Sequence, residues 1–205
     1  MHKKEIVYSG KALDEAKRAL ILIHGRGATA ESMLPLADHL DLDDFAILAP
    51  QATRNTWYPY SFLMPADKNE PWLTGALDLL DDMVGDLTKK GFSSEQIFIS
   101  GFSQGACLSL EFAARNARRW GGIMAFTGGL IGEEINTENY KGDFEGTPVF
   151  IGTSDPDPHI PVTRARDSAR IIQSMNAQVK LEVYPDIGHT VIPEELDVAN
   201  AFVLS

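Results

Sequence analysis

Short apolar runs alternate with longer amphipathic segments along most of the chain, and few folds accommodate this order. The apolar runs are five to six residues long, rich in Ile, Val, Leu and Phe, and lack strict polar alternation, which is typical of buried strands. We expect strands at residues 19–23, 45–49, 96–100, 122–126, 147–152 and 179–184. The amphipathic segments predict helices at residues 31–40, 72–90, 106–120, 162–176 and 194–204.

Repetition of strand and helix predicts an α/β fold with a mostly parallel central sheet and helices on both of its faces. The 205 residues suit one domain, because a domain typically takes about 150 residues. Neither an internal repeat nor a low-complexity linker divides the chain. We therefore expect a single domain over residues 1–205.

The charge balance and the cysteine count exclude several classes of partner and site. The chain has 18 Lys and Arg against 29 Asp and Glu, and the net charge of −11 repels phosphate backbones, so we expect no nucleic-acid partner. The single cysteine, Cys107, excludes an internal disulfide and a multi-cysteine zinc site. The N-terminus lacks the apolar core of a signal peptide, and no run approaches the roughly 20 apolar residues of a membrane span. We expect a cytoplasmic protein without a membrane span.

The most informative motif is Gly101-Phe102-Ser103-Gln104-Gly105, which lies between a predicted strand and a predicted helix. A serine on such a sharp turn projects its hydroxyl above the sheet, and the flanking glycines let neighbouring segments pass close by. The N-terminus of the following helix directs free N–H groups and a partial positive charge to the same place. The motif predicts that Ser103 is a nucleophile; the alternative is an ordinary Gly/Ser turn of a parallel sheet.

A second motif, His24-Gly25-Arg26-Gly27, follows the predicted strand at residues 19–23. Its small residues let the loop approach the nucleophile, so that a backbone N–H group can stabilise a developing oxyanion. By position we assign the two oxyanion donors to the N–H groups of Arg26 and Gln104. His24 comes too early for the usual order of serine, acid and histidine, and we expect it to brace the loop.

The general base is expected in Gly188-His189, between the last predicted strand and the last predicted helix. A loop at that place lies at the same sheet edge as the nucleophile, which is where a general base must be. We therefore predict that His189 is the base. His2, at the N-terminus, and His39, on a helix face, are interpreted as ordinary surface residues.

An acid that orients the histidine is expected in the loop that follows the strand at residues 147–152. Asp155 and Asp157 both fit, because Pro156 and Pro158 push them toward extended conformations in which side chains two apart share a face. Local geometry does not choose between them. A rival interpretation has Asp155, Asp157 and His159 bind a metal ion, but no further cluster supplies ligands, so we expect neither a metal nor an organic cofactor.

Residues 51–71 are too aromatic for a plain connector and too irregular for a helix. In open parallel sheets ligands bind at the carboxyl ends of strands, and this segment, which we call the aromatic loop, begins at such an end. We expect it to form a pocket wall in which Trp57, Tyr58 and Phe62 contact the substrate. The alternative is that these aromatics cover a sheet edge, and the loop is also a candidate surface for a homodimer. Cys107 is interpreted as a small buried side chain.

Together these motifs resemble the carboxylesterase/phospholipase branch of the α/β-hydrolase superfamily, close to acyl-protein thioesterases and small bacterial carboxylesterases. The resemblance covers nearly the whole chain and implies a single α/β-hydrolase domain without a large cap. It implies a serine hydrolase that cleaves small-molecule carboxylic esters or thioesters. The short chain, with little room for a cap, favours short to medium acyl groups. Ser103, His189 and an aspartate would act through an acyl-enzyme.

The resemblance also bears on the choice of acid. The family's acid loop reads Asp-x-x-Val-Pro, and residues 157–161 fit that frame with Ile in place of Val. The family's Gly-x-x-Asp spacing, counted from Gly152, selects Asp155 instead. We favour Asp157.

Several rival functions remain to be compared with a carboxylesterase. Lysophospholipase or acyl-protein thioesterase activity would use the same triad. A dienelactone-hydrolase-like enzyme would carry cysteine at the position of Ser103. A binding protein that has lost catalysis typically has a broken triad, whereas every residue type of the triad is present here. The short chain leaves little room for a cap, which favours a shallow, open site.

Overall fold

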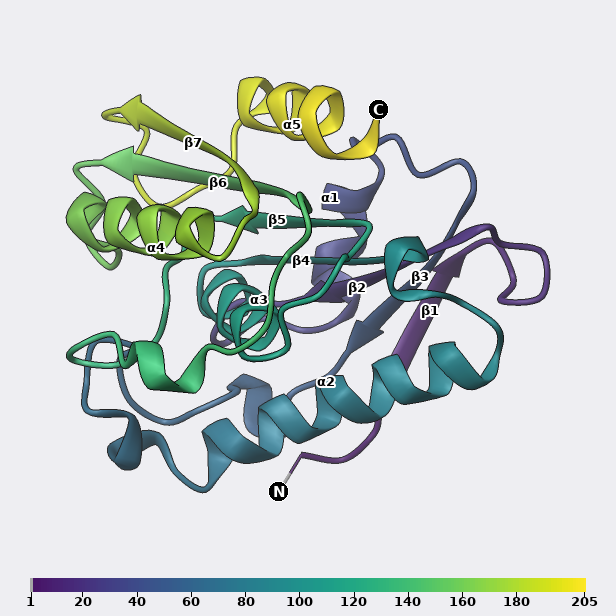
Figure 1. Cartoon of the computed structure of the whole chain (residues 1–205), viewed down its shortest axis with the longest axis horizontal. Coiled ribbons are helices and arrows are strands. Elements are labelled where there is room, and N and C mark those ends of the chain that lie inside the picture. The colour runs from purple at the N-terminus through teal and green to yellow at the C-terminus, as the bar shows by residue number, and fades with distance from the viewer. Residues whose placement is uncertain (1) are drawn as a thin grey trace.

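Seven strands form one sheet in the computed structural model, which describes residues 2–205 (Figure 1). The strand order is β1-β3-β2-β4-β5-β6-β7, and only β1 runs antiparallel to its neighbour. The strands are β1 (Ile6–Gly10), β2 (Arg18–Ile23), β3 (Phe45–Pro50), β4 (Ile97–Phe102), β5 (Gly122–Phe126), β6 (Pro148–Asp155) and β7 (Gln178–Pro185). The expected α/β class with a mostly parallel sheet is confirmed.

Helices cover both faces of the sheet (Figure 1). They are α1 (Leu34–Ala37), α2 (Trp72–Lys89), α3 (Gln104–Arg115), α4 (Val162–Ser174) and α5 (Pro193–Ala199). A 3-10 turn at Glu31–Met33 precedes α1, and a π-helical turn at Asn200–Leu204 follows α5. One apolar cluster joins the sheet to α2, α3 and α4, and a second joins its other face to α1 and α5. The sheet is therefore the middle layer of three.

Alternate side chains of each central strand enter these two clusters. In β2, Ile21 and Ile23 pack toward α2 and α3, whereas Leu20 and Leu22 pack toward the face of α1. All four side chains are fully buried. A strand that is buried on both faces must be apolar throughout, which explains the continuous apolar runs of the sequence.

Some elements differ from the expected ones. The sequence patterns do not predict β1, an edge strand whose residues are all half-buried or exposed. The helix expected at residues 31–40 is reduced to a 3-10 turn and the four residues of α1. The helix expected at residues 106–120 ends at Arg115, because Trp120 leaves it to bury its ring and to donate its N–H to Thr147 Oγ1.

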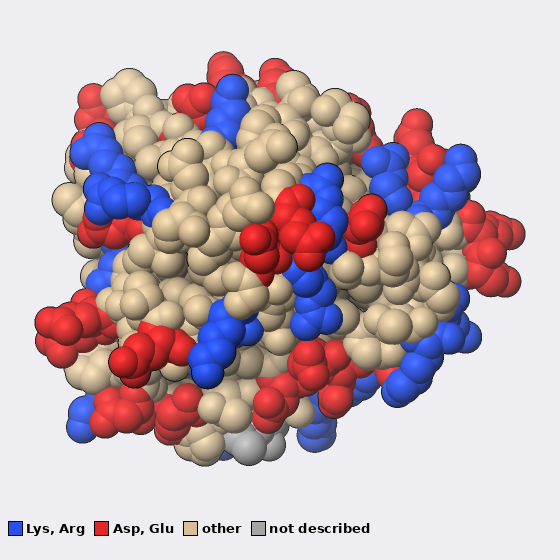
Figure 2. All heavy atoms as spheres, viewed as in Figure 1, with Lys and Arg blue, Asp and Glu red and all other residues tan. Residues whose placement is uncertain are grey.

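Loops at the carboxyl ends of the parallel strands gather at one edge of the sheet, where the arrowheads of β5, β6 and β7 lie in Figure 1. The aromatic loop follows β3 and contains short 3-10 turns at Thr53–Asn55 and Ala66–Asn69. On the face shown in Figure 2, acidic and basic side chains are interspersed among uncharged ones. Within residues 2–205, none of the helices has the length and apolarity that crossing a membrane requires.

Candidate active site

Ser103 occupies a strained turn between β4 and α3. Its backbone dihedrals, φ 55° and ψ −117°, lie in a region that residues with a side chain rarely adopt. A Cβ atom on Gly101 would come within 2.5 Å of the Gly105 backbone, and one on Gly105 would overlap the Ile23 carbonyl. The two glycines thus allow strand, turn and helix to pack closely enough to hold the serine in this conformation.

A continuous chain of hydrogen bonds links Ser103, His189 and Asp157. His189 Nε2 lies 2.8 Å from Ser103 Oγ, and His189 Nδ1 lies 2.8 Å from Asp157 Oδ2. Because the carboxylate can only accept, a neutral His189 donates from Nδ1 and leaves Nε2 free to accept from the serine hydroxyl. This is the arrangement in which a histidine can take the proton of a serine.

The Asp157 carboxylate is fully buried and its other oxygen is also satisfied. Oδ1 accepts the backbone N–H groups of His159 and Ile160, at 2.7 and 2.8 Å. Burial opposes ionisation, but these two donors and His189 outweigh it and hold the pKa of Asp157 below its ordinary value. Asp157 is therefore an anion in the neutral pH range.

Asp155, the other candidate acid, is exposed at the end of β6 and does not reach His189. The two carboxylates separate because β6 continues to Asp155, and the chain then turns so that only Asp157 is directed inward. Within residues 2–205, Asp155, Asp157 and His159 do not form a group able to hold a metal ion.

The two residues assigned as oxyanion donors both hold the aromatic loop with their side chains. The Arg26 guanidinium donates to the carbonyl oxygens of Pro59 and Tyr60, at 2.8 and 2.6 Å. The Gln104 amide accepts the Trp57 N–H at 2.9 Å. Among the described residues, the backbone N–H groups of Arg26 and Gln104 have no hydrogen-bond acceptor, as an oxyanion site requires.

His24 is fully buried behind the loop that carries Arg26. Its Nδ1 donates to the Gly25 carbonyl at 2.7 Å, and its Nε2 accepts the Ala52 N–H at 3.0 Å. Burial lowers the pKa of His24, so the ring is neutral and this tautomer is fixed. His24 thus braces the loop, as expected.

His2 is more than the ordinary surface residue that we predicted. Its Nε2 donates to the Trp57 carbonyl at 2.9 Å, and its Nδ1 accepts the Thr53 N–H at 3.2 Å. The ring therefore ties the N-terminus to the aromatic loop. Nothing in the local sequence signals this contact, because its partners lie about 50 residues away in the chain.

Ser103 and His189 open into a cavity of about 670 Å³. Tyr58 and Phe62 of the aromatic loop line it, and their contact with the substrate stays a prediction. The prediction for Trp57 is corrected, because its fully buried ring packs under the loop and donates from Nε1 to the His24 carbonyl at 2.8 Å. The other lining residues are Gly25, Arg26, Ala28, Pro59, Tyr60, Ser61, Phe102, Gln104, Cys107, His159 and Ile160.

Cys107 belongs to the buried part of this wall. It is 1% exposed, and burial raises the pKa of its thiol to about 12. The thiol is therefore neutral and unreactive near neutral pH, as expected for a small buried side chain. The sequence offered no indication that Cys107 borders the cavity.

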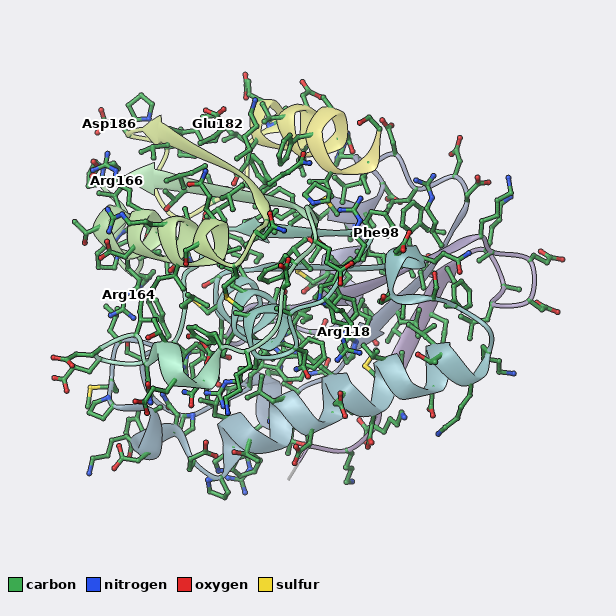
Figure 3. All side chains as sticks on the ribbon, in the orientation of Figure 1. Phe98, Arg118, Arg164, Arg166, Glu182 and Asp186 are labelled. Atoms are coloured by element: carbon green, nitrogen blue, oxygen red, sulfur yellow. The ribbon has the colours of Figure 1, made fainter. Side chains whose placement is uncertain are left out.

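Arg164 anchors the wall on the side of Phe62. It extends from α4 toward the segment after β5 (Figure 3) and donates to the carbonyl oxygens of Leu130 and Gly132, at 2.9 and 2.6 Å. Gly132 in turn donates its N–H to the Phe62 carbonyl at 2.7 Å. Sequence reasoning missed this residue, because the groups that it joins are far apart in the chain.

Comparisons with known proteins place the whole chain among esterases. The family model described as phospholipase/carboxylesterase matches residues 2–204. Acyl-protein thioesterase 1 of Saccharomyces cerevisiae is 27% identical over 93% of this chain and 93% of its own length. The crystal structure of a phospholipase/carboxylesterase from Dyadobacter fermentans has a TM-score of 0.98 and 50% identity, covering 100% of this chain and 98% of that one. The Bacillus cereus carboxylesterase shares the fold, with a TM-score of 0.80, 18% identity and coverage of 97% and 92%.

Proposed function

The chain belongs to the phospholipase/carboxylesterase family and is an ester or thioester hydrolase, and from this premise we propose that Ser103, His189 and Asp157 perform the reaction. The observation that carries the proposal is the pair of 2.8 Å contacts that joins the serine hydroxyl through the imidazole to the buried carboxylate. The backbone N–H groups of Arg26 and Gln104 would stabilise the oxyanion. The substrate is a small-molecule ester or thioester.

In the acylation step, Ser103 Oγ forms a bond to the carbonyl carbon while its proton passes to His189 Nε2. The carbonyl electron pair moves to oxygen, which the two N–H donors and the N-terminus of α3 stabilise. Collapse of the tetrahedral intermediate breaks the bond to the leaving oxygen or sulfur, which takes the proton from His189. Asp157 stays ionised throughout and stabilises the imidazolium.

In the deacylation step, water takes the place of the departed leaving group. His189 accepts a proton from the water as its oxygen attacks the acyl-enzyme carbonyl, and then returns a proton to Ser103 Oγ. The acid is released and the serine is regenerated. A protonated His189 cannot act as base, so activity should fall in acid.

The cavity wall favours acyl groups of short to medium length. Tyr58, Phe62, Cys107 and Ile160 are each at most 6% exposed and form a closed apolar surface beside Ser103. Such a wall can bury a small acyl chain. Thioesters fit the same chemistry, and the sequence relatives named acyl-protein thioesterase favour them as a second substrate class.

Hydrolysis of p-nitrophenyl esters from acetate to dodecanoate tests the proposal. The wild type should turn over the shorter esters fastest, and Ser103→Ala should lower turnover by on the order of 10⁶-fold. Ser174→Ala, at an exposed serine of α4, is the matched control and should match the wild type. Equal turnover by Ser103→Ala and Ser174→Ala would contradict the proposal.

A further inference from the structure

The imidazole of His159 packs against His189 at the mouth of the cavity. The two rings meet edge to face, with centroids 4.8 Å apart and planes at 80°. Phe102 packs on His189 as well, with a centroid distance of 5.1 Å. All three rings line the cavity. His189, which contacts Ser103, therefore packs against both His159 and Phe102.

His159 bonds to Asp157 through its backbone, and its ring is unpaired among the described residues. Its side chain is exposed, and its backbone N–H, rather than its ring, bonds to Asp157. Within residues 2–205, neither ring nitrogen has a hydrogen-bond partner. The ring can therefore offer one donor and one acceptor to a group that enters the cavity.

The proposed chemistry determines which part of a substrate lies beside the ring of His159. The carbonyl oxygen must face the N–H groups of Arg26 and Gln104, whereas the leaving atom must face His189 Nε2, which gives it a proton. The substituent on the leaving atom then extends past His189, where the ring of His159 lines the cavity. The acyl group is directed to the buried wall of Tyr58 and Phe62.

We propose that His159 is a specificity-determining residue that contacts the leaving group and favours alcohols bearing a second hydroxyl near the ester oxygen. This inference rests on the proposed function of Ser103 and His189. A hydroxyl on the leaving group would hydrogen-bond to the free imidazole nitrogens, whereas an alkyl group of the same size would leave them unpaired. Water, the acceptor in deacylation, has no substituent that could extend to His159.

Two esters with one acyl group isolate this contact. In 2-hydroxyethyl acetate and propyl acetate the leaving groups have the same size and differ by a hydroxyl in place of a methyl group. The ratio of their kcat/KM values should fall by about three- to tenfold in His159→Leu, the factor expected from one hydrogen bond, and should be partly kept in His159→Gln. His39→Leu, at an exposed histidine away from the cavity, is the matched control and should keep the wild-type ratio.

Partitioning of the acetyl-enzyme provides a second measurement that does not depend on the fraction of folded enzyme. With p-nitrophenyl acetate as donor, the acetyl group is divided between water and added ethylene glycol or 1-propanol, which enter where the leaving group left. His159→Leu should lower transfer to ethylene glycol by about three- to tenfold and leave transfer to 1-propanol within about twofold.

Each outcome of these measurements decides the proposal. The proposal would be overturned if His159→Leu kept the wild-type ratio of kcat/KM for the two esters and the wild-type ratio of acetyl transfer to the two alcohols. It would also be overturned by an equal loss for both alcohols, because His159 would then only support His189. Failure of the proposed function is distinguishable from these outcomes. In that case the wild type would release no acetate from either ester and would form no acetyl-enzyme on Ser103.

Discussion

At the residue scale, the surroundings of two nearby carboxylates determine their roles. Asp157 is buried, accepts two backbone N–H groups and contacts His189, whereas Asp155 is exposed on the end of β6. We expect Asp157→Asn to lower kcat by on the order of 10³–10⁴-fold, because the amide favours the wrong tautomer of His189.

Asp155→Asn is the matched control and should stay within about twofold of the wild type, because solvent screens an exposed carboxylate from the site. Steady-state kinetics on p-nitrophenyl acetate compares the two variants. A loss in Asp155→Asn as large as that in Asp157→Asn would contradict the assignment of the acid.

Glu195, in the first turn of α5, is a buried acid that the reaction does not use. Its carboxyl group is fully buried against Gly152, and neither oxygen has a partner among the described residues. Burial raises the pKa of Glu195 from 4.5 to about 8. Between these two values the folded chain holds a proton that the unfolded chain has released, so the free energy of unfolding falls as the pH rises.

Glu195→Gln should remove this dependence, because an amide of the same shape does not ionise. The variant should match the wild type near pH 5 and exceed it in free energy of unfolding by a few kcal/mol near pH 8.5, at about 1.4 kcal/mol per pKa unit. Urea unfolding at both pH values gives the comparison. A difference between the two proteins that stays constant with pH would refute the account.

At the element scale, the turn from β4 into α3 depends on close backbone contact. Gly105→Ala places a methyl group on the carbonyl oxygens of Ile23 and His24, so we expect the variant to lose most of its activity and several kcal/mol of stability. Gly85→Ala in α2 is the control, since its Cβ would meet no atom within 4 Å.

The control should stabilise the protein by about 0.5–1 kcal/mol, because alanine is the better helix former. Thermal unfolding followed by circular dichroism, together with esterase activity, measures both effects. A Gly105→Ala variant as stable and active as Gly85→Ala would show that the glycine is not required at the turn.

Sequence patterns predicted those elements whose environment is uniform along their length. The central strands, such as β2 and β4, were predicted correctly because a strand that is buried on both faces must be apolar along its whole length. β1 was not predicted because an edge strand, which is only half-buried, does not require a continuous apolar run. The end of α3 was misplaced because the contact of Trp120 with Thr147, 27 residues on, overrides local helix propensity.

Candidate site residues were predictable where a motif fixes both residue type and place. Ser103 and His189 follow strands whose ends share one sheet edge, so their meeting could be expected before the structure was known. The choice between Asp155 and Asp157 depended on where β6 ends, which periodicity cannot locate to one residue. Trp57 was misassigned because an aromatic residue in a loop can line a cavity or pack beneath it.

At the scale of the whole molecule, the site joins segments from both ends of the chain. The loop after β2 supplies Arg26, the turn after β4 supplies Ser103, and the loop after β7 supplies His189. These loops rest on one sheet whose two faces bury separate apolar clusters. Because both clusters pack on the same strands, unfolding of one removes packing partners of the other.

We therefore expect one cooperative unfolding transition, as for a single domain. Far-UV circular dichroism and tryptophan fluorescence should give the same midpoint in urea, because Trp57 reports on the aromatic loop and Trp120 on the apolar cluster between α3 and β5. Two separated midpoints would show that the loop side of the molecule unfolds independently.

The most direct test of the account is covalent labelling of the nucleophile. A fluorophosphonate that mimics the tetrahedral intermediate is added to the folded protein, and intact-mass and peptide mass spectrometry locate the adduct. We predict one adduct per chain, on Ser103, with labelling abolished in Ser103→Ala and slowed by on the order of 10³-fold or more in His189→Gln. An unlabelled wild type, or an adduct that persists in Ser103→Ala, would contradict the assignment of Ser103 as the nucleophile.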